Sequence, residues 1–179
     1  MSDYRKLYIV GAGGFGREVL WLAERINAYQ KTWDIAGFID DNVKLHGREL
    51  NGIQVVGDCT YFQNLQEEVS VILAVGSPRI KKQLAGQLSQ YDHVEFATLI
   101  DPSVIMSEYI EIGEGTIICA SSILTANIVI GKHVTINLDC TLGHDDIISD
   151  YVTLYPSVNV SGCVSIGTMS ELGTGTQII

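Results

Sequence analysis

The segment TLGHDDII, residues 141–148, places a histidine and two acids behind a glycine in an otherwise monotonous run of apolar, small and polar residues. Imidazole exchanges a proton near neutral pH, which makes His144 a candidate general base. A neighbouring carboxylate can orient such a ring and stabilise the imidazolium that forms. Asp145 is the first candidate for that role, because the spacing of Asp146 matches inward-pointing positions. The alternative is a solvated, outward-facing histidine without a function.

The elements that must position this cluster follow a six-residue period. Every sixth residue from 100 to 178 is aliphatic or Met. No α-helix or coiled coil has this period, whereas a parallel β-helix of hexapeptide repeats does. The series is Ile100, Met106, Ile112, Ile118, Leu124, Ile130, Ile136, Leu142, Ile148, Leu154, Val160, Ile166, Leu172 and Ile178. We expect these side chains to fill the prism, with Cys140 also in its core.

In a β-helix, the number of residues between two positions predicts how far apart they lie in space. Three hexads make one coil, so residues eighteen apart stack about 4.8 Å apart along the axis. Gly162 therefore stands directly beside His144. A glycine at this place lets a reacting group approach the backbone, whose N–H groups can stabilise an oxyanion by about 3–4 kcal/mol.

The first half of the chain alternates strand-like and helix-like segments, which predicts a small parallel sheet covered by helices. The loop GAGGFG joins a predicted strand to a predicted helix, a context that suits phosphate binding. The loop contributes Gly11, Gly13, Gly14 and Gly16. Asp40 and Asp41 end the next predicted strand, where a Rossmann fold would bind a ribose, and Gly76 follows another. NAD binding is one hypothesis, and a tight turn with solvated acids is the other.

Composition excludes several classes of function. The 179 residues are 46% apolar and 18% charged, which is typical of a folded protein. A net charge of −10 offers no basic field for nucleic acid or an anionic membrane. With no long apolar run and no signal peptide visible, we expect a cytoplasmic protein. The four cysteines form no CxxC pair and lack a histidine at metal spacing, so we expect free thiols and no metal.

The order of a GAGGFG-opened α/β domain and hexapeptide repeats with a Gly-His-acid step resembles the sugar acetyltransferases of the hexapeptide-repeat superfamily. It is most similar to the subgroup that N-acetylates UDP-amino sugars or O-acetylates sialic acid. The resemblance implies a Rossmann-like domain over residues 1–98 and a left-handed parallel β-helix over 99–179. It further implies a homotrimer with active sites between subunits, acetyl-CoA as donor, and a role in bacterial surface-glycan biosynthesis.

The resemblance also assigns roles to matching residues. His144 would take a proton from the acceptor as that group attacks the acetyl thioester, and the Gly162 amide would hold the oxyanion. Gly143 and Gly162 would contact CoA. Apart from the resemblance, Lys132 and His133 are candidates to meet the negative charge of CoA, and the alternative is that they form a solvated turn. Asn137 matches an asparagine that lines the acceptor site, and the alternative is an asparagine that serves only the turn. The nucleotide sugar would be held by Gly11, Gly13, Gly14, Gly16, Asp40, Asp41 and Gly76.

Several positions depart from the pattern of the family. Phe15 and Thr153 stand where relatives often carry histidine. The sequence stops in mid-hexad at residues 177–179, so we expect further coils or another chain to cover that end. One rival hypothesis is a nucleotide-sugar-binding or assembly protein whose β-helix is a trimerisation scaffold. An NAD-linked enzyme ranks last, because no second catalytic constellation accompanies the glycine loop.

Overall fold

The structure is a computed structural model that describes residues 4–179, and these separate into two compact units. The first unit comprises residues 4–75 and 82–97, and the second comprises residues 76–81 and 98–179. The short segment 76–81 thus belongs with the repeats, although the chain on both sides of it belongs to the first unit. Within residues 4–179, no helix combines the length and the apolar character that crossing a membrane requires.

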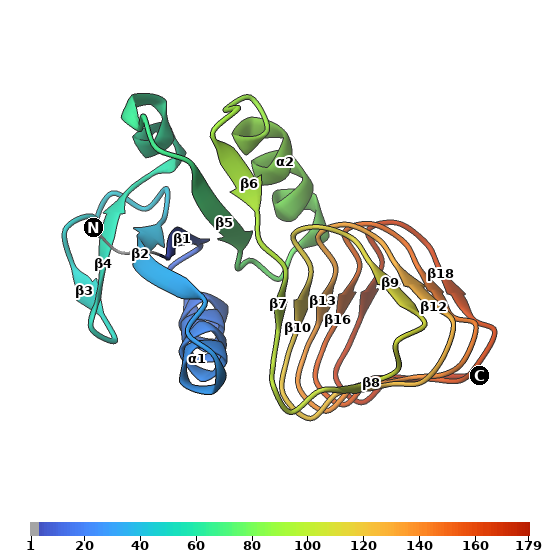
Figure 1. The fold of residues 1–179 in the computed structure, drawn as a ribbon. Helices are drawn as coiled ribbons and strands as arrows, with labels where there is room; N and C mark the ends of the chain where they lie inside the picture. Colours follow the sequence, from blue (N-terminus) through green and yellow to red (C-terminus); the bar gives the residue numbers. More distant parts are fainter. Residues whose placement is uncertain (1–3) are drawn as a thin grey trace. The chain divides into compact units, whose positions relative to one another are not determined.

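The first unit is an α/β domain built on a sheet that has the order β3-β4-β2-β1-β5-β6 within the described residues (Figure 1). Its strands are β1 (Arg5–Val10), β2 (Trp33–Ile39), β3 (Glu49–Leu50), β4 (Ile53–Gly57), β5 (Val69–Leu73) and β6 (Val94–Phe96). Its helices are α1 (Gly14–Tyr29) and the 3-10 helix η1 (Cys59–Asn64), and α2 (Pro78–Leu88) runs from the second unit into the first. All pairings are parallel except that of β3 with β4.

Burial explains why these segments form a parallel sheet. Strand β5 is buried at every residue, and β1 is buried from Leu7 to Val10. Strands covered on both faces read as continuous apolar runs, as these two do. The structure confirms the predicted alternation of strands and helices. It adds β3, β4 and η1, which are too short or too irregular to show a periodic pattern.

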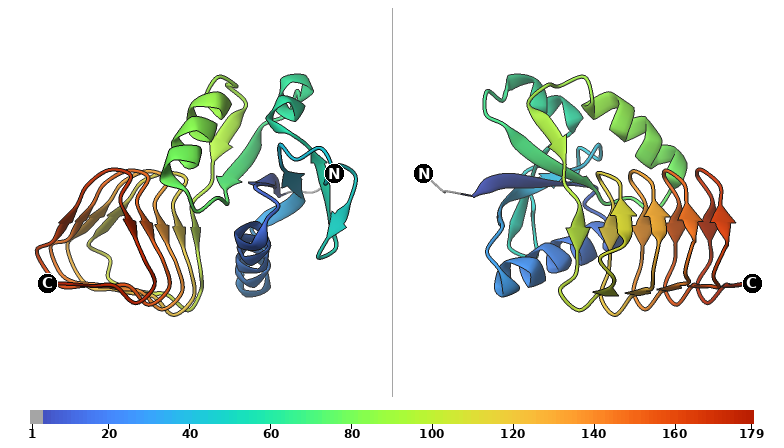
Figure 2. Two further views of the ribbon diagram at one scale, coloured as in Figure 1. Left: turned by 180° about the vertical axis from the view of Figure 1, so that it is seen from behind. Right: turned by 45° about the vertical axis from the view of Figure 1, so that its right-hand side comes forward.

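The second unit is a left-handed parallel β-helix whose residues 98–179 coil around one axis (Figure 2). Its three sheets have the strand orders β19-β16-β13-β10-β7, β20-β17-β14-β11-β8 and β18-β15-β12-β9. The strands are β7 (Leu99–Ile100), β8 (Ile105–Met106), β9 (Ile110–Ile112), β10 (Ile117–Ile118), β11 (Ile123–Leu124), β12 (Ile128–Ile130), β13 (Thr135–Ile136), β14 (Thr141–Leu142), β15 (Ile147–Ile148), β16 (Thr153–Leu154), β17 (Asn159–Val160), β18 (Ser165–Ile166), β19 (Glu171–Leu172) and β20 (Gln177–Ile178).

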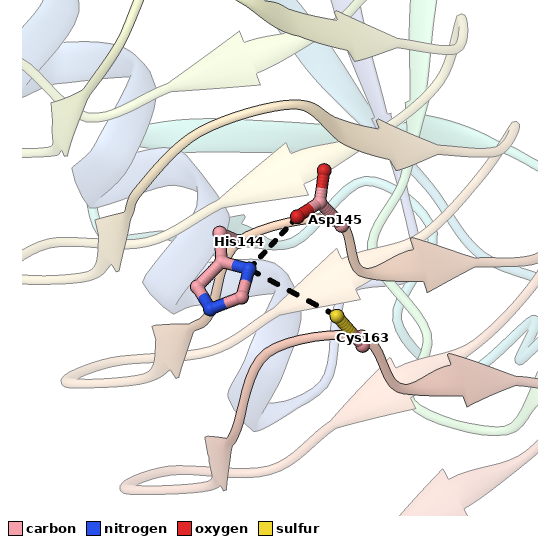
Figure 3. A group of neighbouring side chains, drawn as sticks. All are labelled: His144, Asp145 and Cys163. Carbon is pink, nitrogen blue, oxygen red and sulfur yellow. Dashed lines mark hydrogen bonds and ion pairs between the residues drawn. The ribbon is translucent and has the colours of Figure 1, made fainter.

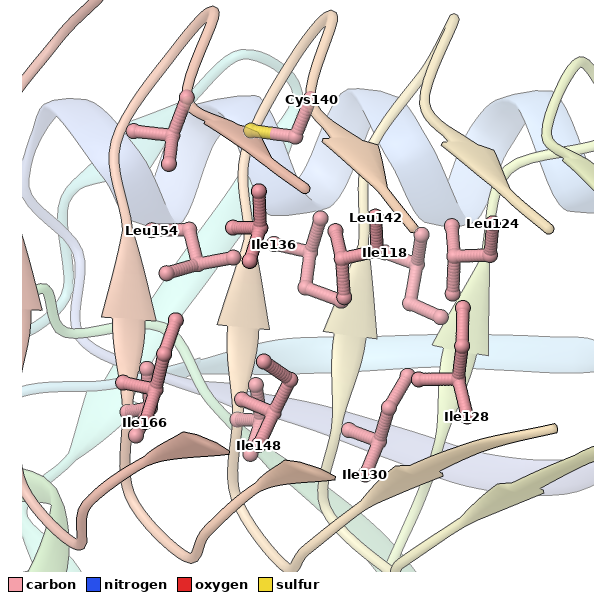
Figure 4. Close-up of a cluster of buried hydrophobic side chains, with 14 residues drawn as sticks. Ile118, Leu124, Ile128, Ile130, Ile136, Cys140, Leu142, Ile148, Leu154 and Ile166 are labelled. Atoms are coloured by element: carbon pink, nitrogen blue, oxygen red, sulfur yellow. The ribbon is translucent and has the colours of Figure 1, made fainter. Parts of the chain in front are cut away.

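The register confirms the eighteen-residue stacking that the period predicts. Ile118 pairs with Ile136, and Ile130 pairs with Ile148. The aliphatic series fills the prism together with Cys140, as Figure 4 shows. Met106 is the exception, because its side chain in the first coil is 36% exposed.

At the corners of the β-helix, the residues with left-handed backbone and the recurring glycines occupy different positions of the hexad. A left-handed residue recurs every sixth position from 115 to 175, and most of these residues are not glycine. Three of the glycines that directly follow inward aliphatics, Gly113, Gly131 and Gly143, allow close packing between coils instead. A methyl group at Gly113 would lie 2.6 Å from Gly131 O, and one at Gly143 would lie 2.7 Å from Gly162 Cα. Glycine therefore recurs where coils touch, and the turns themselves tolerate polar residues.

Segment 76–81 is joined to the β-helix by buried hydrogen bonds. Lys81 Nζ donates to His133 O and to Thr135 Oγ1, both at 3.0 Å, and to Val152 O at 3.3 Å. Thr153 Oγ1 donates to Gly76 O at 2.8 Å. Burial lowers the pKa of Lys81 to about 7, while its three acceptors match the three N–H groups of an ammonium.

Replacing Lys81 by methionine is expected to destabilise the second unit by roughly 1–3 kcal/mol, because His133 O and Thr135 Oγ1 lose a buried donor, while Val152 O keeps only its bond from Thr135 N. Urea unfolding of Lys81→Met, followed by circular dichroism, measures the loss. Lys82→Met is the matched control, since the next side chain in the same helix is exposed. Equal stability of the two variants would contradict the structural role of Lys81.

The stability of the β-helix is expected to depend on pH through His133. His133 is buried and stacks on Tyr151 with ring centroids 5.2 Å apart, and burial lowers its pKa to about 4. An unfolded histidine has a pKa of about 6.5, so between these values the unfolded chain binds more protons and stability falls as pH falls. His133→Asn, which tolerates the φ of 55°, should flatten this decline. Urea unfolding midpoints of the wild type and of His133→Asn, measured from pH 7 to pH 4.5, test this expectation. Midpoints that fall equally with pH in both proteins would refute the role of His133.

Candidate active site

The turn between β14 and β15 carries the candidate residues Gly143, His144, Asp145 and Asp146. Asp145 occupies the left-handed corner position with a φ of 62°, which aspartate tolerates better than most residues. The side chains of His144 and Asp145 are both exposed, at 64% and 53%. The corner therefore presents an imidazole and a carboxylate together at the surface.

The two side chains form a hydrogen-bonded pair. His144 Nδ1 lies 2.8 Å from Asp145 Oδ2, and this bond lowers the pKa of the Asp145 carboxyl. Asn127 Nδ2 supports the same carboxylate by donating to Oδ1 at 3.3 Å, which lowers that pKa further. With its proton on Nδ1 facing Asp145, the imidazole presents Nε2 as the acceptor.

Gly162 lies against the His144 ring, one coil further along the axis. A methyl group at this position would come within 2.6 Å of Nε2, so only glycine fits without moving the ring. The amides on either side belong to the ladder between coils, with Ser161 N donating to Ile178 O and Cys163 N to His144 O. Among residues 4–179, the Gly162 amide makes no such ladder bond. The geometry thus combines a base with a backbone amide at its side.

Asp146 does not share this surface. Its side chain is fully buried, and Oδ1 accepts a hydrogen bond from Val164 N at 2.9 Å. Burial raises the pKa of its carboxyl, and within residues 4–179 Oδ2 has no hydrogen-bond partner. Asp146 therefore supports the turn from inside and leaves Asp145 as the carboxylate that contacts His144.

Three other predicted residues lie away from His144 within one chain. Lys132 stands in the turn between β12 and β13, where Nζ pairs with Glu114 Oε1 at 2.8 Å. Asn137 stands in the turn between β13 and β14, buried, and its Oδ1 accepts from Leu138 N. Thr153 is buried against Gly76 rather than exposed beside the base. The first two occupy different corners of the prism from the one that holds His144.

In the first unit, the shape of the glycine loop, residues 11–16, is held by close backbone packing and by the Asp40 carboxylate. Gly11 has a φ of 109° and donates to Ile39 O, and a methyl group at Gly16 would collide with Gly11. Gly13 and Gly14 face open space at the start of α1. Their exposed amide edge suits a phosphate.

Asp40 and Asp41 have different surroundings. Asp40 accepts from Ala12 N at 2.8 Å through Oδ2 and from Asn42 N at 2.9 Å through Oδ1. These bonds close the glycine loop, so the Asp40 carboxylate is engaged with backbone rather than presented to a ribose. Asp41 is exposed and is the member of the pair that remains at the surface.

Sequence reasoning missed Cys163. Its Sγ lies 4.0 Å from His144 Nδ1, on the side of the ring that faces Asp145 (Figure 3). The available signal was the eighteen-residue stacking, which places position 163 beside position 145. A cavity of about 410 Å³ at the same corner of the preceding coils was not predicted either. It is lined by Glu108, Tyr109, Ile110, Glu111, Asn127, Ile128 and Val129.

Comparison with known proteins relates both units to sugar-modifying enzymes. Residues 6–88 match the family model of the PglD N-terminal domain. The chain is 38% identical over 114 residues to the UDP-N-acetylbacillosamine N-acetyltransferase of Bacillus subtilis (strain 168). That match covers 62% of this chain and 50% of the relative, so the chain spans about half the length of the curated relative.

Two solved structures resemble nearly the whole chain. The acetyltransferase domain of PglB from Neisseria gonorrhoeae FA1090 in complex with acetyl coenzyme A has a TM-score of 0.87 at 28% identity, covering 98% of this chain and 82% of that one. A histidine-to-asparagine mutant of perosamine N-acetyltransferase from Caulobacter crescentus, in complex with CoA and GDP-perosamine, has a TM-score of 0.81 at 25% identity, covering 96% and 79%. These findings confirm the resemblance to the hexapeptide-repeat sugar acetyltransferases.

The contact between Gly162 and the imidazole is directly testable. Gly162→Ala should push the His144 ring away and break its bond to Asp145, because the added methyl group collides with the ring. Gly167→Ala is the control, since a methyl group there meets open space. NMR spectra of the imidazole nitrogens should change for the first variant and not for the second. Unchanged His144 signals in Gly162→Ala would show that the ring does not rest on this glycine.

Proposed function

We propose that this chain transfers an acetyl group from acetyl-CoA to an amino or hydroxyl group of a nucleotide sugar. The observation that carries the proposal is the His144–Asp145 pair with Gly162 packed against its ring. Two of the named relatives are N-acetyltransferases of UDP-N-acetylbacillosamine and of perosamine, and the structure of the second holds GDP-perosamine. A nucleotide-linked amino sugar is therefore the first acceptor class to test.

The proposed reaction is a direct transfer. The acceptor amine or hydroxyl attacks the thioester carbon while His144 Nε2 takes its proton. The carbonyl oxygen becomes an oxyanion, which the Gly162 N–H stabilises. Collapse of the intermediate breaks the carbon–sulfur bond, and the thiolate of CoA leaves and takes up the proton from the imidazolium. Asp145 acts by holding Nδ1–H and by stabilising the positive ring.

The first unit would hold the nucleotide. Gly13 and Gly14 expose backbone at the N-terminus of α1, where amides and the helix dipole favour a phosphate. Asp41 is the exposed acid that would accept hydrogen bonds from a ribose, while Asp40 keeps the loop in shape. Gly76 belongs to the second unit, where its carbonyl is tied to Thr153.

A homotrimer would complete the site. Exposed apolar side chains occupy the outward faces of the two β-helix sheets that meet at the His144 corner. Ile105 and Ile123 lie on one of these sheets, and Val129 and Ile147 lie on the other. Burying such a patch between copies is favourable. Since Lys132 and Asn137 lie at other corners of the same chain, a neighbouring copy would bring these side chains to His144. We place the enzyme in the cytoplasm, in the biosynthesis of bacterial surface glycans.

The decisive experiment is thiol release from acetyl-CoA with UDP- and GDP-linked 4-amino sugars and with sialic acid. His144→Ala should lower the rate by about 10²–10⁴-fold, the usual contribution of a general base. Asp145→Asn should lower it less, since the ring stays in place but loses its anionic partner. Asp92→Asn is the matched control, because Asp92 is an exposed acid of the first unit, outside the glycine loop and the corners of the β-helix.

Light scattering in the same experiment checks that every variant keeps its oligomeric state. A rate that survives in His144→Ala would overturn the role of the base. Binding of a nucleotide sugar by the wild type without thiol release from any acceptor would instead identify a binding protein with a β-helix scaffold.

A further inference from the structure

We propose that His144, Asp145 and Cys163 form a binding site for a thiophilic divalent cation, with Zn²⁺ as the representative ion, and that the bound cation inactivates the base. The binding part stands on geometry alone. The inactivation part rests on the proposed acetyl transfer. The sequence predicts no metal here, because His144 and Cys163 are nineteen residues apart in no known ligand motif.

The donor atoms converge on one point of the surface. His144 Nδ1 lies 2.8 Å from Asp145 Oδ2 and 4.0 Å from Cys163 Sγ, and all three donors lie within 4.8 Å of one another. Zinc ligands at about 2.0–2.3 Å in a tetrahedron are separated by roughly 3.3–3.6 Å. Small side-chain rotations bring the three atoms to that separation. Figure 3 shows the three side chains pointing toward one another.

The types of the three donor atoms favour Zn²⁺. A thiolate, an imidazole and a carboxylate match Zn²⁺, whereas Mg²⁺ and Ca²⁺ prefer oxygen ligands. Cys163 is exposed, while the other three cysteines of the described chain are buried. Neither a disulfide nor burial in the core accounts for a cysteine at this corner. Three protein donors leave the fourth position to water.

The backbone holds the ligands in place before any ion arrives. Asp145 and Cys163 occupy the same left-handed corner position in successive coils, with φ values of 62° and 64°. Cys163 N donates to His144 O at 2.8 Å, which ties the two turns together. Asn127 orients the Asp145 carboxylate from the preceding coil. Such supporting contacts are typical of metal sites.

A cation at Nδ1 would disable the base through the tautomer of the ring. The neutral imidazole keeps one proton, and once Nδ1 donates its lone pair to the metal that proton must reside on Nε2. The Cys163 thiol releases its proton to solvent as it becomes a thiolate ligand. Nε2 then offers a donor to the acceptor sugar instead of a lone pair, so it cannot take the proton of the attacking group.

The binding test is a titration of the metal-free, full chain with Co²⁺ and then Zn²⁺. Co²⁺ bound to Cys163 should produce a thiolate-to-metal charge-transfer absorption in the near ultraviolet at one ion per chain, and Zn²⁺ should displace it. Cys163→Ser should remove the absorption and weaken Zn²⁺ binding at least tenfold. Asp139→Asn, at another corner, should bind like the wild type. No absorption in the wild type, or an equal one in Cys163→Ser, would overturn the site.

The inactivation test uses the same proteins in the thiol-release assay. Stoichiometric Zn²⁺ should stop acetyl transfer by the wild type, EDTA should restore it, and Cys163→Ser should stay active in both conditions. Continued transfer by a wild type that demonstrably holds Zn²⁺ would overturn inactivation. If the metal-free wild type transfers no acetyl group, the proposed function fails, while the Co²⁺ spectrum still decides whether the metal site exists.

Discussion

Stacking of aliphatic side chains at an interval of eighteen residues is the constraint on which the β-helix depends. Each inward residue packs on its counterpart in the next coil, as Ile130 does on Ile148. A slip of one residue would turn this series outward, so the register is strongly specified. The corners inherit the register, and residues at equal positions in successive coils therefore form columns along each edge.

One of these columns brings the proposed base His144 next to Gly162. His144 and Gly162 stand one coil apart, and the absence of a side chain at 162 lets the imidazole lie on the backbone. The adjacent column sets Cys163 beside Asp145. The same stacking that would give the base its oxyanion amide thus also gives it a thiol neighbour. In our proposal, this makes catalysis sensitive to thiophilic cations.

The polar residues that look functional divide into those that face solvent and those that build the fold. Asp40 closes the glycine loop, Asp146 supports the β14–β15 turn from inside, and Thr153 anchors Gly76. Lys81 makes a similar buried connection through three acceptors. Most buried polar groups are hydrogen-bonded, so the residues that make these bonds are constrained by structure as strictly as catalytic ones are. Residue type alone does not separate the two kinds.

The sequence by itself determined the two-part architecture, the inward series and the place of Gly162 beside His144. It could do so because a strict repeat makes separation along the chain equivalent to distance in space. The repeat also places position 163 beside 145, and positions 132 and 137 at other corners. The tertiary structure alone decided that Cys163 Sγ approaches His144 Nδ1, that Lys81 binds the β-helix, and that Lys132 pairs with Glu114. Those outcomes depend on side-chain directions and on contacts between segments, and no local pattern of hydrophobicity encodes them.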